Sequence, residues 1–209
     1  MSARIERVVT SGTFELDGRS WPVDNNVWLV GDDNEVLVID AAHDADAIAT
    51  AVGVRRVVAI VCTHAHSDHI NAAAELTRLT NAPTWLHQAD SILWEMVYPE
   101  HGPARWIEDG AEFEVAGETL HVLHTPGHSP GSVSLHAPGL GSLLSGDTLF
   151  NGGPGATGRS HSDFPTIIES INRRLLTLPP ETVVYTGHGE MTTIGGEAPH
   201  LEEWIARGH

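Results

Sequence analysis

The stretch Thr-His-Ala-His-Ser-Asp-His at residues 63–69 places four side chains that can bind a metal ion within six residues. Imidazole nitrogens and a carboxylate suit zinc and related first-row metals. His64 and His66 are two residues apart, so in an extended backbone both side chains project to the same side and can bind one ion. Asp68 and His69 follow where the chain is expected to turn into a helix, so they can face a second ion nearby. The spacing therefore favours two adjacent metals over one.

The same stretch has a structural alternative, in which a histidine-rich loop precedes a helix and Asp68 caps the helix N-terminus. A lone histidine would favour that alternative. Four ligand side chains at this spacing, between an apolar run and a helical pattern, favour a metal site instead.

Apolar and β-branched runs along the chain are interrupted by patterns of helical period. The runs predict strands at residues 5–9, 27–30, 36–39, 57–61, 120–123, 133–135, 143–144 and 182–185. Helical patterns appear near residues 44–52, 70–79, 91–97, 165–178 and 200–206. Two strand-rich blocks with intervening helices predict two sheets packed together with helices outside.

Other polar residues also follow predicted strands. His128 comes after the strand at residues 120–123, Asp147 after the strand at 143–144, and His188 after the strand at 182–185. Strand ends at one edge of a layered fold are where sites are usually assembled. We therefore expect these three residues to lie near the cluster at residues 63–69.

These segments together resemble the metallo-β-lactamase superfamily. Residues 64–69 match the family signature H-x-H-x-D-H in full, and its later ligand segments look like PGHSPGS (126–132), SGDT (145–148) and TGHG (186–189). Residues 38–40 (VID) resemble the early strand that ends in an aspartate supporting the metal site. The resemblance covers nearly the whole chain. It implies a single domain over residues 1–209 with an α/β (α+β) fold, an αββα sandwich of two mixed β-sheets flanked by helices.

The resemblance also implies how the ligands divide between two divalent metal ions. The first ion would be held by His64, His66 and His128, the second by Asp68, His69 and His188, and Asp147 would bridge them. Asp40 would fix a histidine tautomer or the start of the helix, and Asp68 would also orient the attacking hydroxide. Zinc is expected first, with iron and manganese as alternatives, because these ligand types accept all three.

Asp147 favours one branch of the superfamily. Its β-lactamases generally lack a bridging aspartate at this position, whereas glyoxalase II-like hydrolases have it. A chain of 209 residues is too short for the extra domains of the RNA- and DNA-processing branches. We also expect it to lack the C-terminal helical domain with which larger glyoxalase II enzymes bind glutathione. The resemblance to short glyoxalase II-like hydrolases implies hydrolysis of a thioester by hydroxide formed from a water shared by two metals.

Residues 152–165 (GGPGATGRSHSDFP) form a Gly-rich approach to a predicted helix. Such an approach, with an arginine and a helix N-terminus, can hold an anion, which makes Arg159, Ser160 and His161 candidate substrate-binding residues. The alternative is a tight connection capped by the serine or aspartate just before the helix. Related short sequences carry a shorter Gly-Arg-Thr-Asp-Phe stretch here. The longer loop and the absence of lysine resemble actinobacterial members, whose major thiol is mycothiol, so a mycothiol thioester is the implied substrate.

The amino-acid composition limits which partners and which cellular compartment we expect for the protein. A formal net charge of −17 opposes non-specific binding to nucleic acid, because phosphates would be repelled. Cys62 is the only cysteine, which excludes an internal disulfide and is compatible with a reducing cytoplasm. The sequence shows neither the apolar run of a signal peptide nor the roughly 18 apolar residues of a membrane span. We expect a cytoplasmic protein with a small acyl-thiol substrate and no nucleic-acid or membrane partner; the oligomeric state stays open.

Two other functions fit the same ligands. One is a persulfide dioxygenase with a single Fe(II) held by two histidines and an aspartate. An intact second ligand set that includes His188 favours the hydrolase over it. The other is a metal-binding protein without turnover, and the presence of all seven ligand positions argues against it.

Overall fold

The strands pair into two six-stranded sheets, described over residues 2–208 in a computed structural model. The first sheet has the spatial order β1 (Arg4–Leu16), β2 (Arg19–Gly31), β3 (Glu35–Ile39), β4 (Arg56–Val61), β5 (Thr84–His87) and β6 (Arg105–Ile107). Its first three strands are antiparallel, and β3 to β6 run parallel to one another. Parallel neighbours need a crossover connection, and helices supply one between each pair.

The second sheet has the spatial order β14 (Thr192–Thr193), β13 (Val183–Thr186), β10 (Ser142–Gly146), β9 (Val133–Ala137), β8 (Glu118–His124) and β7 (Glu112–Val115). Only β10 and β13 are parallel, and the other neighbours are antiparallel. A small two-stranded ribbon, β11 (Leu149–Phe150) and β12 (Gly153–Pro154), follows β10. Both sheets are therefore mixed.

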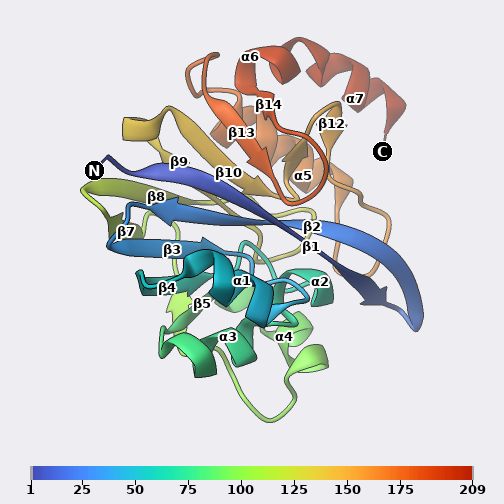
Figure 1. Cartoon of the computed structure of the whole chain (residues 1–209). Coiled ribbons are helices and arrows are strands. Elements are labelled where there is room, and N and C mark those ends of the chain that lie inside the picture. The colour runs from blue at the N-terminus through green and yellow to red at the C-terminus, as the bar shows by residue number, and fades with distance from the viewer. Residues whose placement is uncertain (1, 209) are drawn as a thin grey trace.

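Helices lie on the outer face of each sheet (Figure 1). The first sheet is covered by α1 (Ala45–Val52), α2 (Ser67–Ile70), α3 (Ala73–Thr80), the 3₁₀ turn η1 (Gln88–Asp90) and α4 (Ser91–Val97). The second is covered by α5 (Phe164–Ser170), the π-helical turn η3 (Ile171–Leu175), α6 (Ile194–Glu197) and α7 (Leu201–Arg207). Short 3₁₀ turns η2 (Pro138–Leu140) and η4 (Ala198–His200) complete the chain.

The hydrophobic core has three layers because the central strands are buried on both faces. In β3, Val36 and Val38 pack toward α1 and α3, whereas Leu37 and Ile39 pack between the two sheets. A third cluster joins β10 and β13 to the helices of the second sheet. Strands buried on both faces read as continuous apolar runs, which is why residues 36–39 stand out in the sequence. The predicted αββα sandwich is confirmed.

Several elements differ in extent from the prediction. The strand predicted at residues 5–9 is part of a hairpin of two 13-residue strands, β1 and β2, joined by a two-residue turn at Asp17 and Gly18. The helix predicted at 70–79 is divided into α2 and α3, and that predicted at 165–178 ends in the π-helical turn. Six strands were not predicted, because they are short: β5, β6, β7, β11, β12 and β14. The predicted domain includes residues 1 and 209, which lie outside the described residues.

Within residues 2–208, no helix combines the length and the apolar character needed to cross a membrane.

Candidate metal centre

The predicted ligands come from the carboxyl ends of strands in both sheets. Residues 64–69 lie in the connection between β4 and α3, and their last three residues begin the one-turn helix α2. Asp147 directly follows β10, and His188 follows its parallel neighbour β13. His128 lies in the loop between β8 and β9. Because the two sheets face each other, these ends meet at one edge of the sandwich.

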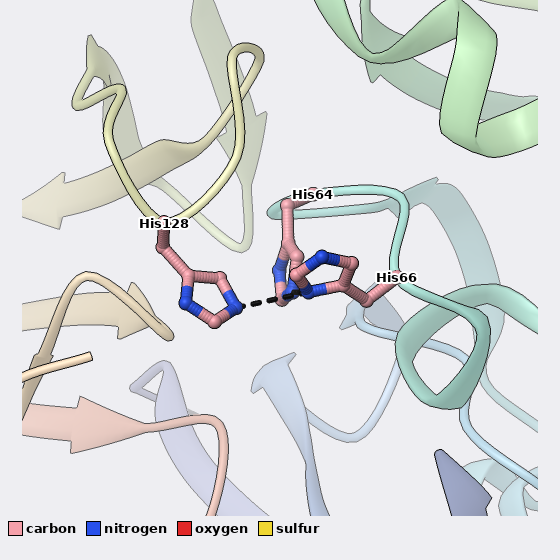
Figure 2. Close-up of side chains that lie close together, drawn as sticks. All are labelled: His64, His66 and His128. Carbon is pink, nitrogen blue, oxygen red and sulfur yellow. Dashed lines mark hydrogen bonds between the residues drawn. The ribbon is translucent and has the colours of Figure 1, made fainter. Parts of the chain in front are cut away.

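Three histidines form a first subsite, which Figure 2 shows in close-up. His64 Nε2 lies 3.1 Å from His66 Nδ1, which lies 2.9 Å from His128 Nε2. Nitrogens bound to one tetrahedral zinc at about 2.0–2.1 Å stand roughly 3.3 Å apart, close to these separations. All three side chains are buried. They are therefore placed to bind one ion.

A second subsite lies beside the first and contains a carboxylate and two histidines. His69 Nε2 lies 3.1 Å from His188 Nε2, and Asp68 Oδ2 lies 3.3 Å from that same His188 nitrogen. Asp147 lies between the subsites, with Oδ2 3.5 Å from His128 Nε2 and 3.3 Å from His188 Nε2. One carboxylate oxygen facing a histidine of each subsite suits a residue that bridges two metals.

The outward-facing nitrogens of four histidines are already hydrogen-bonded to acceptors. The Nδ1 partners are Thr63 Oγ1 for His64 (3.1 Å), Asp40 Oδ2 for His69 (2.9 Å), the Ala156 carbonyl for His128 (2.9 Å) and the Asp24 carbonyl for His188 (2.8 Å). Thr63 Oγ1 itself donates to Asp40, so it accepts from His64. Acceptors at Nδ1 select the tautomer whose Nε2 lone pair points inward, as metal ligation requires.

Asp40 organises the start of this site. Its carboxylate accepts from Thr63 N (2.7 Å), Thr63 Oγ1 (2.8 Å) and His69 Nδ1 (2.9 Å). The residue adopts a left-handed backbone conformation, with φ 59°, that an aspartate tolerates better than most residues. Asp40 thus holds the imidazole of His69, and it also holds Thr63, which directly precedes His64.

Buried polar atoms without a hydrogen-bond partner indicate whether the site fits metal ions. Five buried side-chain atoms among the described residues have no hydrogen-bond partner, and three belong to this cluster: His66 Nε2, Asp68 Oδ1 and Asp147 Oδ1. Burying an unpaired polar atom is costly, so native proteins rarely leave several together. Two carboxylate oxygens and converging imidazoles fit a pair of divalent cations. The clusters are consistent with a dinuclear metal site.

The pKa values of the histidines differ between the two subsites. Burial lowers the pKa of His64 well below its ordinary value, and it lowers the pKa of His66 to about 3 and also that of His128. Burial acts in the same direction at His69 and His188, but nearby carboxylates led by Asp147 outweigh it. They raise the pKa of His69 well above its usual range and that of His188 to about 10. Without metal, the first subsite is therefore neutral and the second carries protons at pH 7.

A cleft of about 210 Å³ opens onto the metal site. Phe14, Val23 and Phe150 contribute apolar walls, and Arg159 also lines the cleft. The Arg159 guanidinium stacks over the rings of Phe14 (5.0 Å) and Trp21 (4.5 Å), which lie on the β1–β2 hairpin. Cations are attracted to the face of an aromatic ring, so the hairpin holds this arginine beside the cleft.

The other two candidate substrate residues are placed differently. Ser160 and His161 are exposed, and neither is among the residues that line the cleft. The Gly-rich loop instead contributes Ala156, which lines the cleft and whose carbonyl accepts from His128. At the end of this loop, Asp163 caps α5 by accepting from Thr166 N.

Several residues of this site were not found in the sequence. Asn25 Nδ2 donates to Asp68 Oδ2 (3.1 Å), and Asn26 Nδ2 donates to the carbonyls of Thr186 and Gly189 on either side of His188. Asp90 accepts hydrogen bonds from the two loops that carry the first subsite. The available signal was a polar pair at residues 25–26, directly before the apolar run in the buried half of β2.

Comparison with known proteins agrees with this geometry. The family model described as "Metallo-beta-lactamase superfamily" matches residues 20–188. "Probable metallo-hydrolase YqgX" of Bacillus subtilis is 34% identical over 83% of this chain and 89% of its own. "Hydroxyacylglutathione hydrolase GloC" of Haemophilus influenzae is 30% identical over 82% of this chain and 89% of its own.

Two solved structures are similar along most of the chain. The BLEG-1 B3 metallo-beta-lactamase has a TM-score of 0.78 at 31% identity, covering 91% of this chain and 97% of its own. TTHA1623 in a di-iron-bound form has a TM-score of 0.76 at 34% identity, covering 85% of this chain and 94% of its own. With the ligand motifs, the fold and these matches in agreement, the chain belongs to the metallo-β-lactamase superfamily.

Proposed function

We propose that this chain is a hydrolase that uses two divalent metal ions to cleave the thioester of a low-molecular-weight thiol. The observation that carries the proposal is the convergence of seven histidine and aspartate side chains, in which four histidines have a hydrogen-bond acceptor at Nδ1 and one oxygen each of Asp68 and Asp147 is buried without a partner. Similarity to GloC supports a thioester as the bond that is cleaved. Zinc is the proposed metal, and iron or manganese are the alternatives.

Two divalent ions, when bound, lower the pKa of a shared water toward neutrality and stabilise the developing oxyanion. Asp68 would orient the attacking water: it lines the cleft, Asn25 binds its Oδ2, and its Oδ1 has no hydrogen-bond partner. Asp40 holds His69 and the end of β4 in place. The products are a carboxylate and a thiol. A thiol leaves readily as its thiolate, because its pKa is about 8.5, so no dedicated general acid is required.

The cleft favours a substrate with an apolar acyl part and a nearby anionic group. Phe14, Val23 and Phe150 would contact the acyl part, and Arg159 would bind a carboxylate. We propose mycothiol as the thiol part of the substrate, because the longer loop at residues 152–165 resembles that of actinobacterial members. A cytoplasmic location, and partners limited to small molecules, without nucleic acid or membrane, belong to the same proposal.

The deciding experiment combines metal analysis with hydrolysis of matched thioesters. Purified protein is stripped with chelator, reloaded with zinc, iron or manganese, and assayed against the same acyl group on glutathione, mycothiol and a simple thiol. We expect two equivalents of metal and chelator-sensitive hydrolysis, with mycothiol preferred. Metal-loaded protein that cleaves no thioester would overturn the function, and loss of preference among thiols would overturn the mycothiol part.

The variant Asp147→Asn serves as the matched control, because it alters the residue between the subsites without changing its size. A β-lactam belongs in the panel because of the B3 metallo-beta-lactamase neighbour. Oxygen uptake with a thiol persulfide tests the single-iron dioxygenase. One equivalent of iron with oxygen uptake and no thioester cleavage would replace our proposal with that activity.

A further inference from the structure

Asp90 is a fully buried carboxylate outside the seven predicted ligands. It ends the 3₁₀ turn η1 and precedes α4 on the outer side of the first sheet. Three neutral groups donate to it: Ala65 N (2.9 Å) and Ser129 Oγ (2.7 Å) to Oδ2, and Gly131 N (2.5 Å) to Oδ1. Removing a carboxylate from water is expensive, so a buried one with this many bonds calls for a structural or functional reason.

The donors to Asp90 belong to the two loops that carry the first subsite. Ala65 lies between His64 and His66, while Ser129 directly follows His128 and Gly131 lies two residues further on. One carboxylate therefore ties together the backbone next to all three histidines of Figure 2. Val133 N also donates to the Thr63 carbonyl (2.8 Å) at the base of the two loops, but Asp90 is bonded to residues directly beside the ligands in both.

The residues of the loop after His128 allow the close approach of the Asp90 carboxylate. A Cβ at position 131 would lie 2.7 Å from Asp90 Cγ, so only glycine allows the approach. Ser132 Oγ accepts from Ser129 N and lies 2.8 Å from Ser129 Oγ. Because the Ser129 hydroxyl proton is directed to Asp90, Ser132 supplies the proton between the two serines. The loop after His128 is thereby closed onto Asp90.

Different residues support the second subsite. Asp68 is bound by Asn25, His69 by Asp40 and His188 by the Asp24 carbonyl. None of these bonds involves Asp90. A change at Asp90 should therefore disturb the first subsite and leave the second in place.

We propose that Asp90 is the positioning residue of the first metal subsite: it holds the loops of His64, His66 and His128 at the separation at which the three imidazoles bind one ion. The proposal rests on the two-metal site proposed above, but not on the identity of the substrate. Partners of this kind, which act through the ligands, typically change metal affinity by 10- to 100-fold.

Asp90→Asn is the direct test, because an amide has the same shape but only one acceptor oxygen. At least one donor among Ala65, Ser129 and Gly131 loses its partner. Metal affinities are measured by competition with a chromophoric chelator, without substrate. We expect about 10- to 100-fold weaker binding of one ion and a second ion unchanged. The same substitution in an Asp68→Asn background, where the second subsite is damaged, identifies the weakened ion as the first.

Asp32→Asn is the matched control. Asp32 is also buried and also accepts backbone N–H bonds, from Asn34 and Glu35, but these lie in the turn between β2 and β3. Its replacement should lower thermal stability without changing either metal affinity. If Asp90→Asn weakens both ions alike, or neither, Asp90 is an ordinary structural residue and the proposal is overturned.

Ser129→Ala is a milder variant that removes one donor and decides the case if Asp90→Asn does not fold. It should weaken the first ion in the same direction by a smaller factor, and unchanged affinity would overturn the proposal. Metal binding that follows the expected pattern without thioester hydrolysis would leave this inference intact and overturn only the proposed substrate. A wild-type protein that binds no metal would overturn both.

Discussion

At the scale of single residues, the two subsites differ in the protons that they hold before metal arrives. In the metal-free protein the pKa of His188 is about 10, and that of His69 is also raised, so both are protonated at pH 7. Burial keeps His64, His66 and His128 neutral. Ligation through Nε2 requires the neutral ring, so protons must leave the second subsite but not the first.

We therefore expect metal binding at pH 7 to release roughly two protons, nearly all with the ion of the second subsite. Calorimetric titration in buffers of different ionisation enthalpy measures this number. As pH rises through about 10, the proton on His188 is already lost and its share of the release disappears. The shared water can add a proton of its own, so the decisive outcomes are equal release by both ions, or no fall in the release as pH rises through about 10, either of which would contradict this division.

Arg159 allows a second prediction at this scale. Its guanidinium is exposed and held by aromatic rings, so Arg159→Gln should remove a charged hydrogen bond to the substrate without disturbing the metal ligands. We expect KM for an anionic thioester to rise roughly tenfold, about 1.4 kcal/mol, with kcat little changed. The same thioester with its carboxylate converted to an amide should show no such difference.

Arg105→Gln is the control for that prediction. Arg105 is an exposed arginine on the edge strand β6, and it does not line the cleft. Its replacement removes the same charge from the molecule and should leave KM unchanged. A rise in KM of equal size in both variants would point to the overall charge, and not to a bound carboxylate at Arg159.

At the scale of elements, the β1–β2 hairpin forms one side of the cleft. Its two-residue turn requires left-handed backbone at Asp17 (φ 52°) and Gly18 (φ 71°), the pattern that Asp-Gly turns provide. Near this turn Phe14 and Trp21 stack on each other, and the Arg159 guanidinium lies over both rings. The Asp-Gly dipeptide is a sequence signal for a hairpin, but the strand prediction used only apolar runs and did not include it.

Gly18→Val should destabilise the protein by about 1–2 kcal/mol, because a β-branched residue is strained in left-handed backbone. Gly102→Val is the matched control: neither glycine has a neighbour within 4 Å of an added Cβ, but only Gly18 has a left-handed φ. Denaturant unfolding of the two variants measures the difference in the free energy of unfolding. Equal losses would show that φ at position 18 has no particular cost.

At the scale of the whole molecule, bound metal would join the two halves of the sandwich. The first sheet supplies residues 64–69, and the second supplies His128, Asp147 and His188. Ions that bind only the folded state stabilise it by an amount that grows with the logarithm of their concentration, about 4 kcal/mol at 1,000 times the dissociation constant.

Removing the metal should therefore lower the melting temperature, and adding it back should restore the lost stability. Differential scanning calorimetry at several metal concentrations tests the logarithmic dependence. His188→Ala lacks one ligand and should show a smaller gain from the same metal. A melting temperature that is unchanged after complete removal of metal, verified by elemental analysis, would show that the site contributes nothing to holding the sheets together.

The sequence by itself determined the class of fold and the set of chemical groups at the centre. The apolar runs predicted the central strands, because a strand buried on both faces is apolar at every position. The motif at residues 64–69, with His128, Asp147 and His188 in order, indicated two metals because ligand chemistry depends on side chains that the sequence shows directly.

Only the tertiary structure decided what surrounds those ligands. The Asp24 carbonyl that binds His188 is 164 residues away in sequence, and the Ala156 carbonyl that binds His128 is a backbone atom that any residue could supply. Asp90 and Asn25 reach the site from separate elements, 25 and 43 residues from their partners in the motif. Such contacts depend on how the sheets and loops pack, and neither residue type nor spacing records them. The sequence shows which side chains can bind metal, but the hydrogen bonds that orient those side chains arise from packing.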